Sequence, residues 1–215
     1  MAGSRGEYRK SAQRREQIVE AAFAVFAKAG YTASSVSQIA REVGMTQAGV
    51  LHHFAGGKTA LLEAVLERRD ERAEQVLEGR RGTGFLAGLV EISREQAGLR
   101  GAVQLYTILS AEATDPDHPA HERFRDRVER IASAVANAYA EARADGALRE
   151  GVEPRAAALS TLAMTEGLEL LWLNGQDVDM AEAIRAHINT FLAEPLQPAL
   201  PGARQTADQP TPTAR

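Results

Sequence analysis

Apolar residues recur every three or four positions along most of the chain, and no segment alternates apolar and polar residues with a period of two. The first spacing is typical of one face of an α-helix, whereas the second would indicate a strand. The pattern therefore predicts an all-α fold with about nine helices. These helices are expected at residues 11–29, 34–43, 47–53, 58–78, 85–96, 102–113, 120–144, 155–174 and 180–193.

Small and polar residues mark the expected ends of these helices. Gly30 and Gly44 follow the first and second helices, as glycine often does at a helix C-terminus. Thr46 and Asp179 precede the third and last helices, where a side-chain oxygen can accept from the first-turn N–H groups. Residues 1–10 are polar and basic, and residues 194–215 hold five prolines. We expect a flexible basic tail at the first segment and a disordered Pro-rich tail at the second.

The predicted helix 155–174 is apolar on two faces, one with Leu159 and Leu170 and the other with Leu168 and Trp172. Such a helix must be buried on both faces. The second face can be covered by a deeper core of the same chain or by a second copy. The second alternative predicts a homodimer, in which this helix and the last one form a four-helix bundle. The expected interface residues are Leu168, Trp172, Ile184, His187, Ile188 and Phe191.

Cysteine and several motifs of common enzyme chemistry are missing from the sequence. The chain has no cysteine, which excludes disulfides, thiolate metal sites and cysteine nucleophiles. It also lacks a Gly-rich phosphate loop, a Gly-x-Ser-x-Gly motif and the Glu-x-x-His motif of metal-binding bundles. We predict no catalytic residue, no cofactor and no enzymatic activity. No apolar run reaches the ~18 residues of a membrane span, and the N-terminus is polar, so a cytoplasmic protein without membrane contact is expected.

Acidic and His side chains gather between residues 115 and 122. His118 and His121 have the i, i+3 spacing that allows two metal ligands on one helix. Pro119 instead favours the start of a helix whose first turn attracts acidic side chains. We favour the second interpretation and predict no metal site. The weighed residues are Asp115, Asp117, His118, His121 and Glu122.

Basic residues are concentrated near the N-terminus. Residues 1–60 contain eight Lys and Arg against four Asp and Glu, although the whole chain has a net charge of −4. The first 60 residues therefore carry +4 and the remainder −8. A basic segment attached to an acidic body favours one end that faces a polyanion. Arg9, Lys10, Arg14 and Arg15 could be such a DNA-contacting arm or simply a solvated helix start.

Residues 34–54 have the pattern of a helix-turn-helix, with two short helices around a turn at Gly44. Ala40 is small where the two helices must cross. The second helix would enter the major groove with its N-terminal residues. Gln47 can then form two hydrogen bonds to adenine, and the small Ala48 allows close approach to a thymine methyl group. A helical hairpin without a role in DNA binding is the alternative.

Residues 12–66 resemble the DNA-binding domain of the TetR family of bacterial transcriptional regulators. The matching positions are Ser34-Ser35-Val36, Ile39-Ala40, Gly44-Met45-Thr46, Val50-Leu51-His52-His53-Phe54, Lys58 and Leu61-Leu62. Leu51 stands where the family usually has Tyr, and the loop at residues 55–57 is one residue longer than usual. The DNA contacts that the resemblance implies are Ser34, Ser35, Thr46, Gln47, Ala48, Gly49, His52, His53 and Lys58.

The rest of the chain resembles the regulatory half of TetR-family proteins of actinobacterial type, in residues 110–121 and 167–180. The resemblance implies a DNA-binding domain at residues 11–57 and a ligand-binding and dimerisation domain at 58–193. It further implies a homodimer, usually a repressor, that a small-molecule effector releases from a pseudo-palindromic double-stranded DNA operator. Glu166 interrupts an apolar face and could bind the ligand or form an internal ion pair. The candidate ligand-binding residues are Tyr106, Phe124, Glu166 and Trp172, of which the aromatic ones could instead be core residues.

Overall fold

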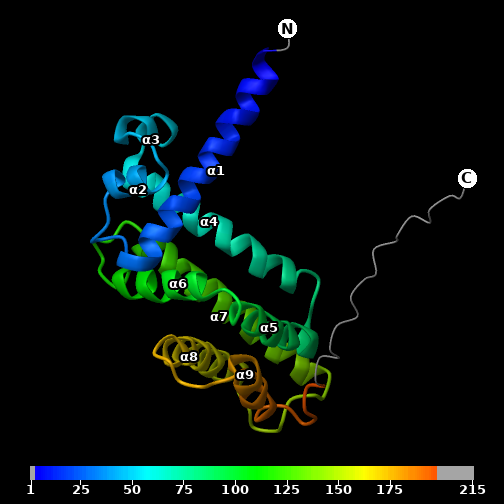
Figure 1. The fold of residues 1–215 in the computed structure, drawn as a ribbon. Coiled ribbons are helices and arrows are strands. Elements are labelled where there is room, and N and C mark those ends of the chain that lie inside the picture. Colours follow the sequence, from blue (N-terminus) through cyan, green and yellow to red (C-terminus); the bar gives the residue numbers. More distant parts are fainter. Residues whose placement is uncertain (1–2, 198–215) are drawn as a thin grey trace, which may run out of the picture.

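The computed structural model describes residues 3–197, except for the side chains of residues 3–7 and 68–74. This part of the chain is helical, and its one β-bridge joins single residues, Leu148 and Leu192. No helix in it has the length and the apolar character needed to cross a membrane. The nine helices of residues 3–197 are α1 (Gly3–Ala29), α2 (Val36–Glu42), α3 (Gln47–His53), α4 (Gly57–Leu77), α5 (Gly82–Gln96), α6 (Arg100–Glu112), α7 (His121–Ala144), α8 (Pro154–Leu173) and α9 (Met180–Asn189) (Figure 1).

The predicted all-α fold is confirmed, with a correction at each end. α1 begins at Gly3, so residues 3–10, which were expected to form a flexible tail, belong to the helix. Residues 7–17 contain neither Gly nor Pro, and a helix that is already nucleated extends easily through such a sequence. α9 ends at Asn189 because the chain beyond it pairs with residues 147–149: the Arg149 N–H donates to the Phe191 carbonyl (2.9 Å). The part of the predicted disordered tail beyond residue 197 lies outside the described residues.

Helices α1, α2 and α3 form a small head, and the remaining helices form a larger body that α4 connects to it (Figure 1). The buried apolar side chains make two clusters. The first contains Phe26 of α1, Ile39 of α2 and Leu61 of α4 together with Leu105 and Leu109 of α6. The second cluster joins α5, α7, α8 and α9. Because α6 contributes to the core of the head, the head is packed directly on α6.

Helix α8 is apolar on two faces, as predicted, but three of the six residues expected at a dimer interface lie inside the single chain. Leu168, Ile184 and Ile188 are 7%, 1% and 0% exposed, so they are core residues of a single chain. The two apolar stripes of α8 look alike in the sequence, and only packing against α7 and α9 distinguishes them. The face left in solvent carries large apolar residues that are 38–51% exposed: Leu159, Met164, Leu170 and Leu171.

Candidate functional site

Helices α2 and α3 are joined by a tight turn whose polar groups are satisfied locally. The Ser35 hydroxyl accepts from the Gln38 N–H (3.2 Å), and the Gln38 side chain accepts from the Ser35 N–H (2.7 Å). This capping box fixes the start of α2. Gly44 has a φ of +68°, which lets the chain reverse after α2 without steric strain. The Met45 N–H then reaches the Ala40 carbonyl at 2.8 Å, which closes the turn.

Helix α3 has one packed face and one exposed face. Val50 is fully buried, whereas Gln47 and Ala48 of the first turn are exposed. The Thr46 hydroxyl accepts from the Gly49 N–H at 3.1 Å and caps the helix. The predicted base-reading residues therefore lie together on the exposed N-terminal turn of a helix whose start is fixed.

The other end of α3 is held by α1. The Arg15 guanidinium donates to the His53 carbonyl at 2.8 Å and lies 4.0 Å from the centroid of the buried Phe54 ring. A cation at this position satisfies a carbonyl at the helix C-terminus and complements the helix dipole. His52 is exposed at the same end. Sequence reasoning listed Arg15 only as part of a basic run and missed this contact.

Two predicted DNA contacts are engaged inside the protein. Ser34 is 6% exposed and its hydroxyl donates to the Gly30 carbonyl. The Lys58 ammonium donates to the Tyr31 and Ser34 carbonyls, both at 2.8 Å, and lies 4.1 Å from the Tyr31 ring centroid. Burial lowers the pKa of Lys58, and Glu112 partly offsets this effect. Both side chains thus satisfy carbonyls of the α1–α2 connection.

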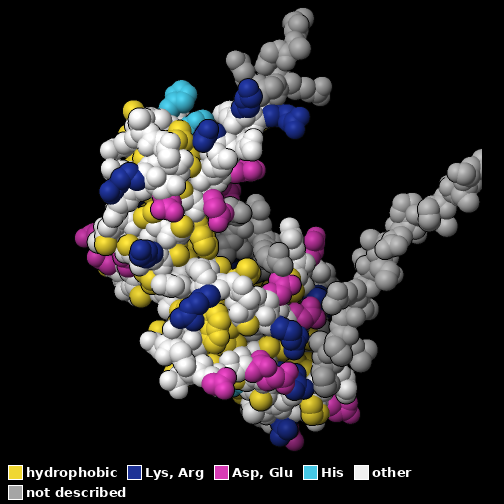
Figure 2. Space-filling model, in the orientation of Figure 1, with side chains coloured by type: hydrophobic (Ala, Val, Ile, Leu, Met, Phe, Trp, Pro, Cys, Tyr) yellow, Lys and Arg dark blue, Asp and Glu magenta, His cyan; other side chains and the backbone are white. Residues whose placement is uncertain are grey.

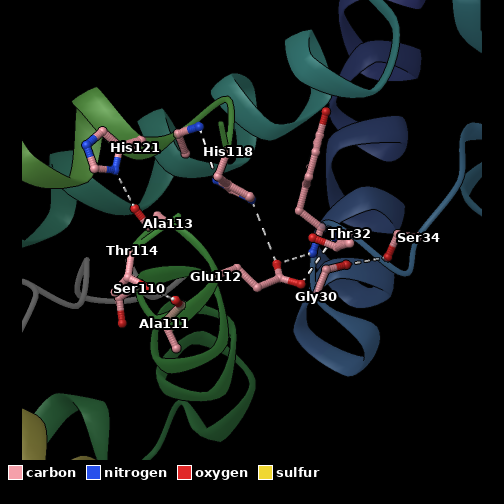
Figure 3. Close-up of polar contacts among 12 residues, drawn as sticks. Gly30, Thr32, Ser34, Ser110, Ala111, Glu112, Ala113, Thr114, His118 and His121 are labelled. Atoms are coloured by element: carbon pink, nitrogen blue, oxygen red, sulfur yellow. Dashed lines mark hydrogen bonds and ion pairs between the residues drawn. The ribbon is translucent and has the colours of Figure 1, made fainter. Parts of the chain in front are cut away.

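The α1–α2 connection is also bound by a carboxylate from the body, as Figure 3 shows. Glu112, the last residue of α6, accepts from the Tyr31 N–H at 2.7 Å and from the Thr32 N–H at 3.2 Å. Gly30 has a φ of +74°, and a Cβ built on it would lie 2.5 Å from a Glu112 carboxylate oxygen. Glycine is therefore required here both for the backbone conformation and for the approach of the carboxylate. Glu112 joins the end of α6 to the start of the helix-turn-helix.

His118 lies behind this carboxylate. It is 8% exposed, and its Nδ1 accepts from the Ala120 N–H at 3.2 Å. Its Nε2 is 3.9 Å from the nearer Glu112 oxygen and has no hydrogen-bond partner. Burial lowers the pKa of His118; Glu112 and Asp115 oppose this effect and Lys58 adds to it. The neutral imidazole is thus the form that the folded protein favours.

The weighed metal cluster does not assemble in the described part of the chain. His118 is engaged as above, and His121 Nδ1 lies 2.9 Å from the Ala113 carbonyl (Figure 3). No group of three or more His, Cys, Asp and Glu side chains among the described residues could hold a metal ion. The two imidazoles instead shape the connection between α6 and α7.

The body contains a cavity of about 800 Å³ between α4, α5, α6, α7 and α8. Most of its wall is apolar, with a smaller number of polar groups. Arg127 donates to the Tyr106 hydroxyl, and its guanidinium lies 4.4 Å from the Tyr106 ring centroid. The N-terminal half of α6 forms one side of this wall through Ala102 and Val103, together with the N-cap residue Leu99. One helix therefore lines the cavity at one end and binds the head through Glu112 at the other.

Comparison with known proteins shows which proteins this chain resembles in sequence and in fold. Residues 18–65 match the family model of the bacterial regulatory proteins, tetR family. The chain is 40% identical over 60 residues to the transcriptional regulator SrpR of Pseudomonas putida, a match that covers 28% of each chain. GusR of Salmonella enterica is 25% identical with a TM-score of 0.67, and the match covers 84% of this chain and 95% of GusR. Residues 18–65 therefore carry the sequence pattern of the TetR family, and the fold as a whole is similar to that of GusR.

The structure of SmeT with triclosan is similar in fold, with a TM-score of 0.67 at 20% identity over 94% of this chain and 100% of SmeT. The match with SrpR spans less than a third of that relative, so it describes the N-terminal region alone. SrpR and the other curated relatives matched by this region are named as transcriptional regulators.

Of the four residues that the sequence analysis named as candidates for ligand binding, two line the cavity. Tyr106 and Glu166 lie in its wall. Phe124 and Trp172 are absent from that lining; the Phe124 ring packs 5.2 Å from Tyr106, and Trp172 lies under Arg100.

The sequence analysis also overlooked a buried carboxylate in the cavity wall. Glu169 is 5% exposed. It falls four residues after Thr165 and eight after Thr161, which also line the cavity. This helical spacing was the available signal, because residues three or four apart share a helix face.

We expect the free energy of unfolding to fall as the pH drops from about 7.5 to about 5.5. The unfolded chain takes up a proton on His118 near its ordinary pKa of about 6.5, whereas burial lowers the pKa of His118 in the folded protein, which binds this proton only at lower pH. The stability contribution is therefore complete above that pH and is lost below it. His118→Asn keeps an acceptor near the position of Nδ1 and should flatten the dependence.

Urea unfolding at a series of pH values tests this prediction. His187, whose pKa burial also lowers, provides a matched variant, His187→Asn, that accounts for the remaining dependence. An unchanged pH profile in His118→Asn would show that the buried imidazole does not carry the effect.

Proposed function

We propose that this TetR-family chain is a homodimeric transcriptional regulator, most simply a repressor of actinobacterial type, that acts on DNA in the cytoplasm. It binds a pseudo-palindromic operator through α3 and leaves it when a small molecule occupies the cavity. The observation that carries the proposal is the exposed first turn of α3, with Gln47 and Ala48, on a helix fixed at both ends by Thr46 and Arg15.

The chemistry of α3 supports reading of base edges in a major groove. The Gln47 amide oxygen can accept from the N6 amino group of adenine while its NH2 group donates to N7, which is a bidentate pair. Ala48 is small enough to contact a thymine methyl group. Ser35, Thr46 and Gly49 border this surface, and His52 and His53 lie at its far end, next to the path of the phosphates. Helices of this class read bases with their N-terminal residues.

The cavity supports release by an effector. Its volume lies in the range of ~300–1,000 Å³ that is usual for small-molecule sites, and its wall is mostly apolar with few polar groups. SmeT, which shares the fold, was solved with triclosan. An occupant that displaces the N-terminal half of α6 would also displace Glu112 and the backbone that it holds. A ligand that favours the displaced state shifts the protein away from DNA.

The exposed face of α8 supports the homodimer. Eight small or apolar residues follow one another on this face at helical spacings: Ala156, Leu159, Ser160, Ala163, Met164, Gly167, Leu170 and Leu171. His187 borders the same face, with its Nε2 3.4 Å from the Ser160 hydroxyl. A contiguous apolar surface of this kind is typical of a protein interface. A two-fold pairing through α8 would present two copies of α3 to successive half-sites, ~34 Å apart.

Replacing Gln47 by Ala should weaken binding to the selected operator by about 1–3 kcal/mol, because a contact with a base is lost. Binding to a random duplex should be nearly unchanged, because the contacts with phosphates remain. Fluorescence anisotropy with a duplex selected by the full chain from a random library measures both. Gln176→Ala removes the same amide from an exposed position in the body and should have no effect. Equal losses on both duplexes would contradict a base-reading role for Gln47.

Replacing Leu170 by Glu should convert the dimer to a folded monomer, since the new charge would have to be buried in the interface. Ile184→Glu is the contrasting variant: Ile184 is 1% exposed within one chain, so this charge should unfold the protein. Sedimentation velocity and circular dichroism distinguish the two outcomes. A dimeric Leu170→Glu variant would place the interface on another surface.

A further inference from the structure

The first half of α1 extends beyond the packed part of the head (Figure 1). Ile18 is the first buried residue of the helix, and the described side chains from Tyr8 to Gln17 are all exposed. Arg15 binds the end of α3. With a rise of ~1.5 Å per residue, Arg9 lies roughly 9 Å further along the axis than Arg15. This segment forms an arm that begins beside α3, and its described side chains, from Tyr8 to Gln17, contribute nothing to either core.

The arm is strongly basic. Residues 8–17 carry Arg9, Lys10, Arg14 and Arg15 against one acidic residue, Glu16. Arg15 is used to hold α3, but within the described residues no ion pair or hydrogen bond engages Arg9, Lys10 or Arg14. Figure 2 shows Lys and Arg side chains in dark blue on the described part of α1, on the same side of the molecule as α3.

The spacing of these basic residues places them on one face of the helix. Lys10 and Arg14 are four residues apart and therefore neighbours on the helix, and Arg9 and Gln13 border them. Like charges in this arrangement repel one another in the isolated protein. A polyanion that runs along the arm removes this repulsion and gains further free energy from the counterions it releases. The phosphate backbone of a duplex is such a polyanion.

We propose that residues 8–14 of α1 form a second DNA-binding element, which contacts phosphates flanking the segment read by α3. The proposal rests on the proposed function, because only a duplex bound to α3 lies beside the arm. Its contacts are independent of base sequence. They add affinity and salt dependence to operator binding and extend the length of duplex that one protomer covers.

The test compares the full chain with the variant R9Q/K10Q/R14Q on duplexes selected by the full chain from a random library. Gln keeps the helix propensity of the arm while removing its charge, and Arg15 is left in place. Each duplex is used in a long form with flanks of about ten base pairs and in a form trimmed to the selected core. Each phosphate contact contributes ~0.9 to the slope of log affinity against log salt concentration.

We expect the variant to reduce this slope by up to about 2.7 for each arm on the long duplex and to leave it nearly unchanged on the trimmed one. The control variant R125Q/R143Q/R155Q removes the same charge from exposed positions of the body and should change neither slope. Circular dichroism verifies that both variants remain folded.

Equal slopes for the full chain and the arm variant on the long duplex would overturn the proposal, as would an equal change in the control variant. An equal change on the long and the trimmed duplex would also contradict contacts with flanking phosphates. A full chain that selects no sequence from the library would instead contradict the proposed function, so the two failures are distinguishable.

Discussion

The Glu112 carboxylate is the contact on which the arrangement of head and body depends. At the end of α1 the backbone turns sharply, and the Tyr31 and Thr32 N–H groups both donate to an acceptor from outside the turn. Glu112 supplies both, while Lys58 supplies donors to the carbonyls of Tyr31 and Ser34. Hydrogen bonds to a charged group are worth about 1.5–3 kcal/mol each. The polar groups of this turn are therefore satisfied from α4 and α6, which fixes the orientation of α2 and α3 relative to the body.

Through the same contact, α6 connects the cavity to the head in the proposed mechanism. The helix lines the cavity with Ala102 and Val103, packs into the core of the head with Leu105 and Leu109, and ends at Glu112. A displacement at the cavity end is carried by a rigid helix of 13 residues. The head is expected to move together with α6, because the core of the head includes residues of α6. The cavity and the head are thus joined through packed side chains and one carboxylate.

The helices and the helix-turn-helix were predictable from the sequence because both depend on local patterns, namely apolar spacing, caps and turn glycines. Gly30 was correctly placed at a helix end, but its contact with Glu112 was not foreseen, since the two residues lie 82 positions apart and nothing local relates them. Lys58 was assigned to DNA by its position in a motif, which says nothing about the direction of a flexible side chain. Leu168, Ile184 and Ile188 were expected at an interface but lie in the core of one chain, because two apolar stripes with similar spacing differ only in what packs against them.

The central claim, that the state of the cavity reaches the head through Glu112, is tested most directly by a double-mutant cycle. Ala102→Phe fills the cavity from α6, and Glu112→Ala removes the link; affinity for the selected duplex is measured for all four chains. The account predicts that Ala102→Phe weakens DNA binding in the parent chain but has much less effect when Glu112 is absent, a non-additive result. The same factor in both backgrounds would contradict it, because the cavity would then act on the head by a route that does not include Glu112.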